Sequence, residues 1–119
     1  YIKSFIQKRI KIADFYYKEI VNDKLRLPFK CSKGVHTFNQ FTIRVKDRSK
    51  LERYLKKCKV PYGIYYSKPI YRYGAYKSDN FINLPMVEKV SKECLSLPIY
   101  PELNLKDVKL IVDVLNKYE

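Results

Sequence analysis

The sequence predicts a small α/β fold in which two or three short strands are covered by several helices. Helical and strand-like hydrophobic patterns alternate along the chain, and every strand-like pattern is short. The length of 119 residues suits one domain, or a piece of a larger one. Apolar residues form 46% of the chain, which is enough to build a packed core.

The first predicted elements are an amphipathic helix over residues 1–22 and a strand over residues 36–46. A loop over residues 23–35, closed by Gly34, separates them. The apolar residues of the helix recur at three- and four-residue spacing: Ile2, Phe5, Ile6, Ala13, Tyr16, Tyr17 and Ile20. The alternation of the strand places Phe38, Gln40, Thr42 and Arg44 on one face, and Thr37, Asn39, Phe41, Ile43 and Val45 on the other.

A second helix is predicted over residues 49–58, followed by a short strand over residues 62–66. Ser49 and Glu52 form the S-x-x-E pattern of a capping box, in which each side chain satisfies a free backbone donor of the first turn. Pro61 prevents the helix from extending further, because proline cannot continue a helix.

The last third of the chain is expected to form two helices around a short edge strand. Residues 67–83 are irregular and rich in tyrosine, and Pro85 opens a third helix because its fixed φ suits the first turn. Residues 95–101 hold two prolines, which limits them to an edge strand or a turn. The clearest helix covers residues 104–118, with Asn104 as its cap.

The charge of the chain is strongly positive. Lys plus Arg numbers 25 and Asp plus Glu 12, so the net charge is +13, which favours an anionic partner. Most of these residues are lysines, 19 against 6 arginines, and an AT-rich genome produces the same excess of Lys, Ile, Tyr and Asn. Because nucleic-acid readers usually rely on arginine, the charge alone does not indicate nucleic-acid binding.

The three cysteines and the hydropathy of the chain argue against a metal site and a membrane span. Cys31, Cys58 and Cys94 lack the close spacing of zinc ligands, so we expect reduced thiols in a cytoplasmic protein and no bound metal. No apolar run approaches the roughly 18 residues of a membrane-spanning helix.

No complete set of catalytic residues is recognisable in the sequence. The three glycines are scattered, so there is no phosphate-binding loop, and no nucleophile elbow is present. His36 could serve as a general base, but a single histidine beside a glycine turn is more often a residue at a strand edge. We therefore predict no catalytic, cofactor-binding or metal-binding residue in this chain.

A cluster of tyrosines is the most unusual feature of the sequence. Aromatic faces among cations would suit an anionic, ring-bearing ligand such as a nucleotide sugar, or the stacked bases of single-stranded nucleic acid. The same tyrosines would also be explained by packing on the core with their hydroxyls at the surface. The cluster consists of Tyr62, Tyr65, Tyr66, Tyr71, Tyr73 and Tyr76, with Lys68, Arg72 and Lys77 among them.

Three segments, in this order, resemble the small domain of the DegT/DnrJ-type sugar aminotransferases (perosamine-synthase-like). The segment HTFNQFTIRVKDRSKLERYLKK resembles the strand and helix that open that domain. GIYYSKPIYRYGAY resembles the family's Tyr-Pro-x-Pro-Leu-His-x-Gln-x-Ala-Tyr loop, and LPMVEKVSKECLSLPIYPELNLKDV resembles its ending. LSLPIYPEL is the most specific of these matches.

The resemblance implies an α+β small domain with a short, mostly antiparallel sheet, the C-terminal domain of an aspartate-aminotransferase-like enzyme of fold type I. Residues 1–22 would be the helix that links it to a large domain, and residues 23–119 the small domain itself. The family uses pyridoxal phosphate to aminate nucleotide-linked keto sugars, and its Schiff-base lysine lies in the large domain. The isolated chain is therefore expected to bind no cofactor and to be inactive without that domain. The resemblance also implies that the complete enzyme, with both domains, is a homodimer.

The resemblance also implies which residues face the substrate. By the matching positions, these are Tyr66, Lys68, Tyr71 and Tyr76. The chain departs from the family pattern at four positions. In the loop, Tyr71, Tyr73 and Ser67 stand where the family has His, Gln and Pro, respectively. In the strand, Asn39 stands where the family has its second His. The alternative is a small basic nucleic-acid-binding module that uses the same Tyr- and Lys-rich loop.

Overall fold

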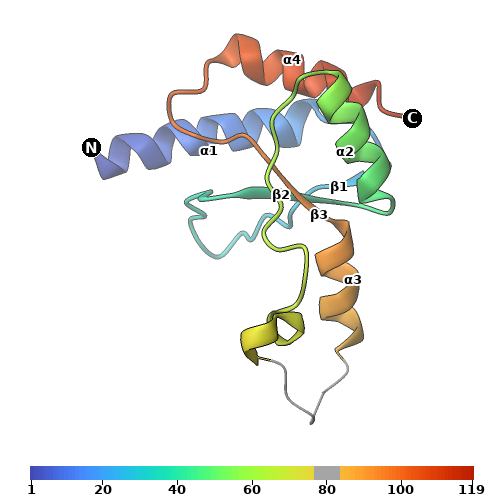
Figure 1. Cartoon of the computed structure of the whole chain (residues 1–119). Coiled ribbons are helices and arrows are strands. Elements are labelled where there is room, and N and C mark those ends of the chain that lie inside the picture. Colours follow the sequence, from blue (N-terminus) through green and yellow to red (C-terminus); the bar gives the residue numbers. More distant parts are fainter. Residues whose placement is uncertain (77–83) are drawn as a thin grey trace.

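A three-stranded antiparallel sheet with the strand order β1-β2-β3 lies at the centre of the fold (Figure 1). The structure, a computed structural model, describes residues 1–76 and 84–119. The strands are β1 (Leu25–Arg26), β2 (Phe41–Val45) and β3 (Cys94–Leu97), and the helices are α1 (Ile2–Glu19), α2 (Arg48–Lys57), α3 (Pro85–Glu93) and α4 (Leu105–Asn116), with short 3-10 turns η1 (Ile70–Arg72) and η2 (Gly74–Tyr76). The predicted α+β fold is confirmed.

Helices α1 and α4 run side by side on one side of the sheet, and α3 projects from the other side together with η1 and η2 (Figure 1). The alternation of β2 directs Phe41, Ile43 and Val45 into the core, as predicted for that face. The largest fully buried side chains of the core are Tyr16, Phe41, Ile43, Leu51, Leu55, Leu95, Leu115 and Val108.

Two asparagines join the C-terminal ends of α1 and α4. Nδ2 of Asn22 donates to the carbonyl oxygens of Leu115 (2.8 Å) and Tyr118 (2.7 Å). In the opposite direction, Nδ2 of Asn116 donates to the carbonyl oxygen of Glu19 at 2.9 Å. These bonds run in both directions between the two helix ends, so the two ends stabilise each other.

The predicted strand over residues 36–46 is too long at its N-terminal end. Phe38 has a φ of 48°, and its backbone N–H donates to Nδ1 of His36 at 2.9 Å. This turn interrupts the extended backbone, so β2 begins only at Phe41. It also places Phe38 in the core beside Phe41, although the alternation assigned these two rings to opposite faces.

The predicted capping box of the second helix is wrong, because the capping residue lies two positions before Ser49. The cap of α2 is Asp47, whose side chain accepts from the backbone N–H of Lys50 at 3.0 Å. Glu52 does not reach back to Ser49, because its carboxylate contacts Arg48 (3.6 Å) and accepts the Tyr62 hydroxyl at 3.2 Å. An aspartate at the cap position satisfies a free backbone N–H of the first turn without help from a second side chain.

The later elements agree more closely with the patterns. Pro85 lies in the first turn of α3, and the Asn104 side chain caps α4 by accepting from the N–H of Asp107 at 2.9 Å. The predicted strand over residues 62–66 is reduced to one bridge between Gly63 and Ser96. Of the irregular stretch, residues 67–76 contain η1 and η2, while residues 77–83 lie outside the described part.

Candidate functional site

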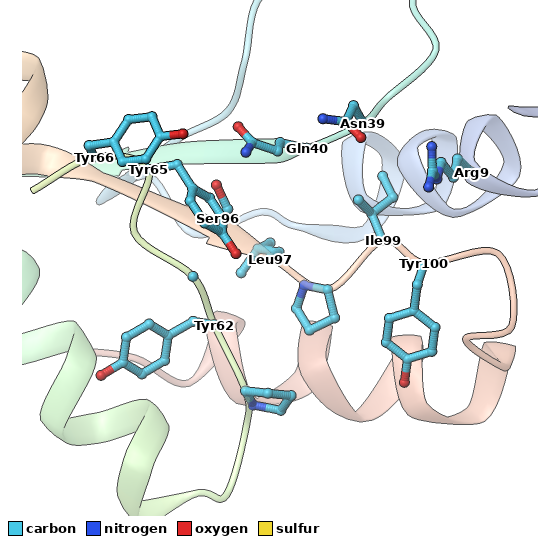
Figure 2. A pocket seen from close by; sticks show the side chains of 13 residues that line it. Arg9, Asn39, Gln40, Tyr62, Tyr65, Tyr66, Ser96, Leu97, Ile99 and Tyr100 are labelled. Carbon is cyan, nitrogen blue, oxygen red and sulfur yellow. The ribbon is translucent and has the colours of Figure 1, made fainter.

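A cavity of about 540 Å³ opens where α1, the segment before β2, the segment after α2 and β3 meet (Figure 2). Aromatic rings and short polar side chains form most of its wall. Among the described residues that line it, Arg9 is the only one with a charged side chain. The lining residues are Arg9, Asn39, Gln40, Pro61, Tyr62, Gly63, Tyr65, Tyr66, Ser96, Leu97, Pro98, Ile99 and Tyr100.

Gly63 positions the tyrosines of this wall. Its backbone forms two hydrogen bonds with Ser96 of β3, of 3.0 and 2.7 Å, which fix the segment after α2 against the sheet edge. The ring of Tyr65 then folds back over Gly63, so a methyl group added there would lie 2.6 Å from Cε2 of Tyr65. Tyr66 packs edge-on against Tyr65, with ring centres 5.9 Å apart. Only glycine leaves room for this arrangement.

The opposite part of the wall carries amide and guanidinium groups. Figure 2 shows Gln40, Asn39 and Arg9 in sequence along one side of the cavity, while the ring of Tyr100, on the segment after β3, points away from them. Nε of Arg9 is buried and has no hydrogen-bond acceptor among the described residues. Amides and hydroxyls of this kind are donors and acceptors for sugar hydroxyls, and a guanidinium binds an oxyanion.

Two of the four predicted site residues lie at cavities. Tyr66 lines the cavity just described and also a second, more apolar one of about 440 Å³ beside α3. Lys68 lines the second cavity together with Ile70, Met86 and Val87. Tyr66 therefore lies between the two cavities, and Lys68 belongs to the apolar one.

Tyr71 and Tyr76 line neither of these cavities. The Tyr71 hydroxyl donates to Oε1 of Glu88 on α3 at 3.0 Å, and Arg72 donates to the same oxygen through Nε at 2.6 Å. The hydrogen bond from Arg72 lowers the pKa of Glu88, whereas loss of solvent, followed by the bond to Glu88, raises the pKa of Tyr71. Glu88 thus holds η1 against α3, while Tyr76 is 63% exposed in η2.

Arg9, Gln40, Ser96 and Tyr100 were not among the residues that sequence analysis singled out. For Arg9 the signal is present, because it follows Ile6 by three residues and precedes Ala13 by four, so it lies on the apolar stripe of α1. A cation on such a stripe indicates a polar partner on that side. The other three are brought to the cavity by contacts between distant segments.

The wall of the cavity does not fit a covalently held pyridoxal phosphate. Such a site needs a lysine for the Schiff base and a carboxylate for the pyridine nitrogen, and neither type occurs among the described lining residues. No group of three or more potential metal ligands is found among residues 1–76 and 84–119. Within the same part of the chain, every helix is too short or too polar to cross a bilayer.

Comparison with known families identifies the family of this fold. The model of the DegT/DnrJ/EryC1/StrS aminotransferase family matches residues 1–116. The chain belongs to this family. Aminotransferases of the DegT/DnrJ/EryC1/StrS family depend on pyridoxal phosphate, and a structural neighbour from Bacillus subtilis was solved with bound cofactor PMP.

The curated relatives include aminotransferases whose names specify nucleotide-linked sugars. The chain is 30% identical over 118 residues to a dTDP-3-amino-3,6-dideoxy-alpha-D-galactopyranose transaminase of Aneurinibacillus thermoaerophilus. It is 27% identical over 106 residues to a UDP-2-acetamido-2-deoxy-3-oxo-D-glucuronate aminotransferase of Pseudomonas aeruginosa. These matches cover 99% and 89% of this chain but 32% and 29% of the relatives, so the chain spans about a third of their length.

Solved structures confirm the fold class. DesV of S. venezuelae, in complex with a ketimine intermediate, superposes with a TM-score of 0.91 at 23% identity, over 98% of this chain and 32% of DesV. A family member from Brucella abortus gives 0.81 at 28% identity, over 93% of this chain and 30% of that protein. The resemblance found in the sequence is therefore confirmed, and the nucleic-acid-binding alternative receives no support from these comparisons.

Proposed function

We propose that the chain forms the small C-terminal domain of a pyridoxal-phosphate-dependent aminotransferase that aminates a nucleotide-linked keto sugar in amino-sugar biosynthesis. The observation that carries this proposal is the family match over residues 1–116, in a chain that spans only about a third of its curated relatives. The names of those relatives, which specify dTDP- and UDP-linked sugars, support the substrate class.

In this proposal the cavity of about 540 Å³ is part of the sugar-nucleotide pocket. Its tyrosine faces suit a sugar ring or a base, and its amides suit hydroxyl groups. Tyr66 lies at the cavity itself, and we place Lys68, Tyr71 and Tyr76 on the adjoining loop that faces the substrate in the complete enzyme.

The Schiff-base lysine and the carboxylate that pairs with the pyridine nitrogen would come from a large domain. The described lining residues of the cavity include neither type, which supports this division. Residues 1–22 would link the two domains, residues 23–119 would form the small one, and the complete enzyme would be a homodimer. Cys31, Cys58 and Cys94 are all free thiols, which supports a cytoplasmic location.

A spectral titration tests the division of labour between the domains. The chain is mixed with pyridoxal phosphate, and a full-length relative serves as the positive control. We expect no saturable absorbance band and no lysine labelled after borohydride reduction. A stoichiometric, borohydride-trapped adduct on one lysine would mean that the chain has a cofactor site of its own, and the proposed division would be wrong.

A chimeric enzyme tests the proposed activity. The large domain of the Aneurinibacillus thermoaerophilus relative is joined to residues 1–119 of this chain, and amination of a nucleotide-linked keto sugar is measured. We expect activity from the chimera and none from the chain alone. Tyr66→Ala should raise KM for the sugar substrate, because Tyr66 lines the cavity.

A further inference from the structure

Arg9 differs from Arg44 and Arg48, the other partly buried arginines of the described residues, because its guanidinium makes no hydrogen bond or ion pair with any of those residues. Nη2 of Arg44 pairs with Glu93 at 2.7 Å. Arg48 contacts Glu52 at 3.6 Å and donates through Nη1 to the carbonyl oxygen of Cys94 at 3.3 Å, although its buried Nε, like that of Arg9, has no hydrogen-bond partner. Arg9 takes part in none of the ion pairs of the described residues, and its buried Nε has no acceptor there. Buried polar atoms in folded proteins are nearly always hydrogen-bonded, so this guanidinium requires an acceptor that the described residues do not supply.

The surroundings of Arg9 favour an anionic acceptor from a ligand. The described residues of the cavity wall include no carboxylate, so no side chain there neutralises the guanidinium. The side chains of Asn39 and Gln40 line the same cavity, and neither makes a hydrogen bond to a described residue. These groups are free to donate to a ligand that Arg9 holds by its charge (Figure 2).

We propose that Arg9 is the anion-binding residue of the cavity and that it receives an oxygen of a phosphate or carboxylate group of the bound sugar compound. The planar guanidinium donates two parallel hydrogen bonds to either group, which a lysine cannot do. The amides of Asn39 and Gln40 would then fix the orientation of the group next to the anion. The class of compound in this assignment rests on the proposed function. The assignment adds the residue that binds the negatively charged group of that compound.

The position of Arg9 on α1 explains how it is held for this purpose. Ile12, Ala13 and Tyr16 follow it on the same helix and are buried in the core, so the backbone of α1 is rigid there. A guanidinium on a fixed helix loses less freedom on binding than one on a loop. Arg9 is therefore a binding residue that is already in place before the ligand arrives.

Binding measurements on the chain itself test the proposal without cofactor or catalysis. Isothermal titration calorimetry is performed with UDP, inorganic pyrophosphate, uridine and D-glucuronate, on the parent chain and on Arg9→Gln and Arg26→Gln. Arg26 is exposed in β1, so its substitution removes the same charge at a distance from the cavity. Circular dichroism verifies that each variant is folded.

We expect saturable binding of at least one anion, weakened about ten- to hundredfold by Arg9→Gln and less than about twofold by Arg26→Gln. Arg9→Lys should bind with intermediate affinity, because it keeps the charge and loses the paired donors. Loss of UDP and pyrophosphate binding would identify a phosphate as the group, and loss of glucuronate binding a carboxylate. Uridine, which has neither, should bind equally to all four proteins.

Three results would overturn the assignment. These are equal weakening by Arg9→Gln and Arg26→Gln, binding that is unaffected by Arg9→Gln, and no saturable binding of any of the anions by the folded chain. The outcome is separate from that of the chimera, because binding requires no transamination. An active chimera with no effect of Arg9→Gln on binding would reject only the role of Arg9.

Discussion

The hydroxyl of Tyr16 on α1 donates a 2.8 Å hydrogen bond to the carbonyl oxygen of Pro98, 82 residues further along the chain. The Tyr16 side chain is fully buried, and its ring centre lies 5.0 Å from that of Phe41 in β2. Loss of solvent raises the pKa of Tyr16 well above its usual value, so the hydroxyl remains a donor at any ordinary pH. This one side chain joins α1, the sheet and the segment that borders the cavity.

Tyr16→Phe should therefore lower the free energy of unfolding by about 1–2 kcal/mol, because the carbonyl of Pro98 loses its donor while the ring still fills the core. Urea denaturation followed by circular dichroism measures the change. Tyr1→Phe is the matched control, since Tyr1 is fully exposed, and it should have no measurable effect. Equal stability of the two variants would contradict a structural role for the Tyr16 hydroxyl.

Gly63→Ala should displace the ring of Tyr65, because the new methyl group would lie 2.6 Å from Cε2 of that ring. The NMR signals of Tyr65 should shift, while stability should fall by less than about 1 kcal/mol, because this half-exposed ring can move toward solvent instead of overpacking the core. Gly34→Ala should change neither quantity, since nothing lies within 4 Å of a methyl group there. An unchanged Tyr65 spectrum would show that the ring does not depend on Gly63.

Asp47→Ala should cost about 1 kcal/mol of stability, because the N–H of Lys50 loses its acceptor in the first turn of α2. Ser49→Ala should cost much less, since Ser49 caps nothing in the structure. The comparison in thermal denaturation separates two capping candidates that lie two positions apart. A larger loss of stability for Ser49→Ala than for Asp47→Ala would support the predicted capping box of Ser49 and Glu52 instead.

Acid should release η1 from α3 through Glu88. The pKa of this carboxyl is held below its usual value of 4.5, chiefly by the hydrogen bond from Arg72. A lowered pKa in the folded state means that the ionised form contributes stability above the unfolded pKa, and this contribution is lost as the pH falls through the folded pKa. The NMR signals of Tyr71 should therefore change with acid below about pH 4.5.

Glu88→Gln should abolish that acid-dependent change in the Tyr71 signals, because the titrating partner is gone. Glu102→Gln serves as the control, since Glu102 is exposed in the segment before α4 and does not belong to α3. Persistence of the acid transition in Glu88→Gln would assign it to another group.

Local patterns were sufficient to predict the helices of this fold. The apolar spacing and the Asn104 cap located α4 well, and Pro85 marked the start of α3, because these signals depend only on neighbouring residues. The start of β2 was wrong because the alternation continues through His36 and Phe38, where a local hydrogen bond turns the backbone instead. The alternation of apolar and polar residues gives no sign of such a turn.

The candidate site was only partly predictable. Tyr66 and Lys68 were found through the resemblance, and both lie at cavities, whereas Tyr71 contacts Glu88 and Tyr76 is exposed. The wall of the main cavity combines segments that are separated by up to 91 positions, from Arg9 to Tyr100. Their proximity depends on how α1 packs against the sheet, which no local pattern encodes.

The hydrogen bonds of Asn22 to the carbonyls of Leu115 and Tyr118 have a consequence for synthesis on the ribosome. Translation runs from the N-terminus, so α1 is made first, while its partners in α4 are made more than 90 residues later. Until α4 has emerged, the apolar stripe of α1 lacks one of the surfaces that covers it. The nascent chain must therefore carry an exposed amphipathic helix until α4 has been made, and final folding awaits the arrival of α4.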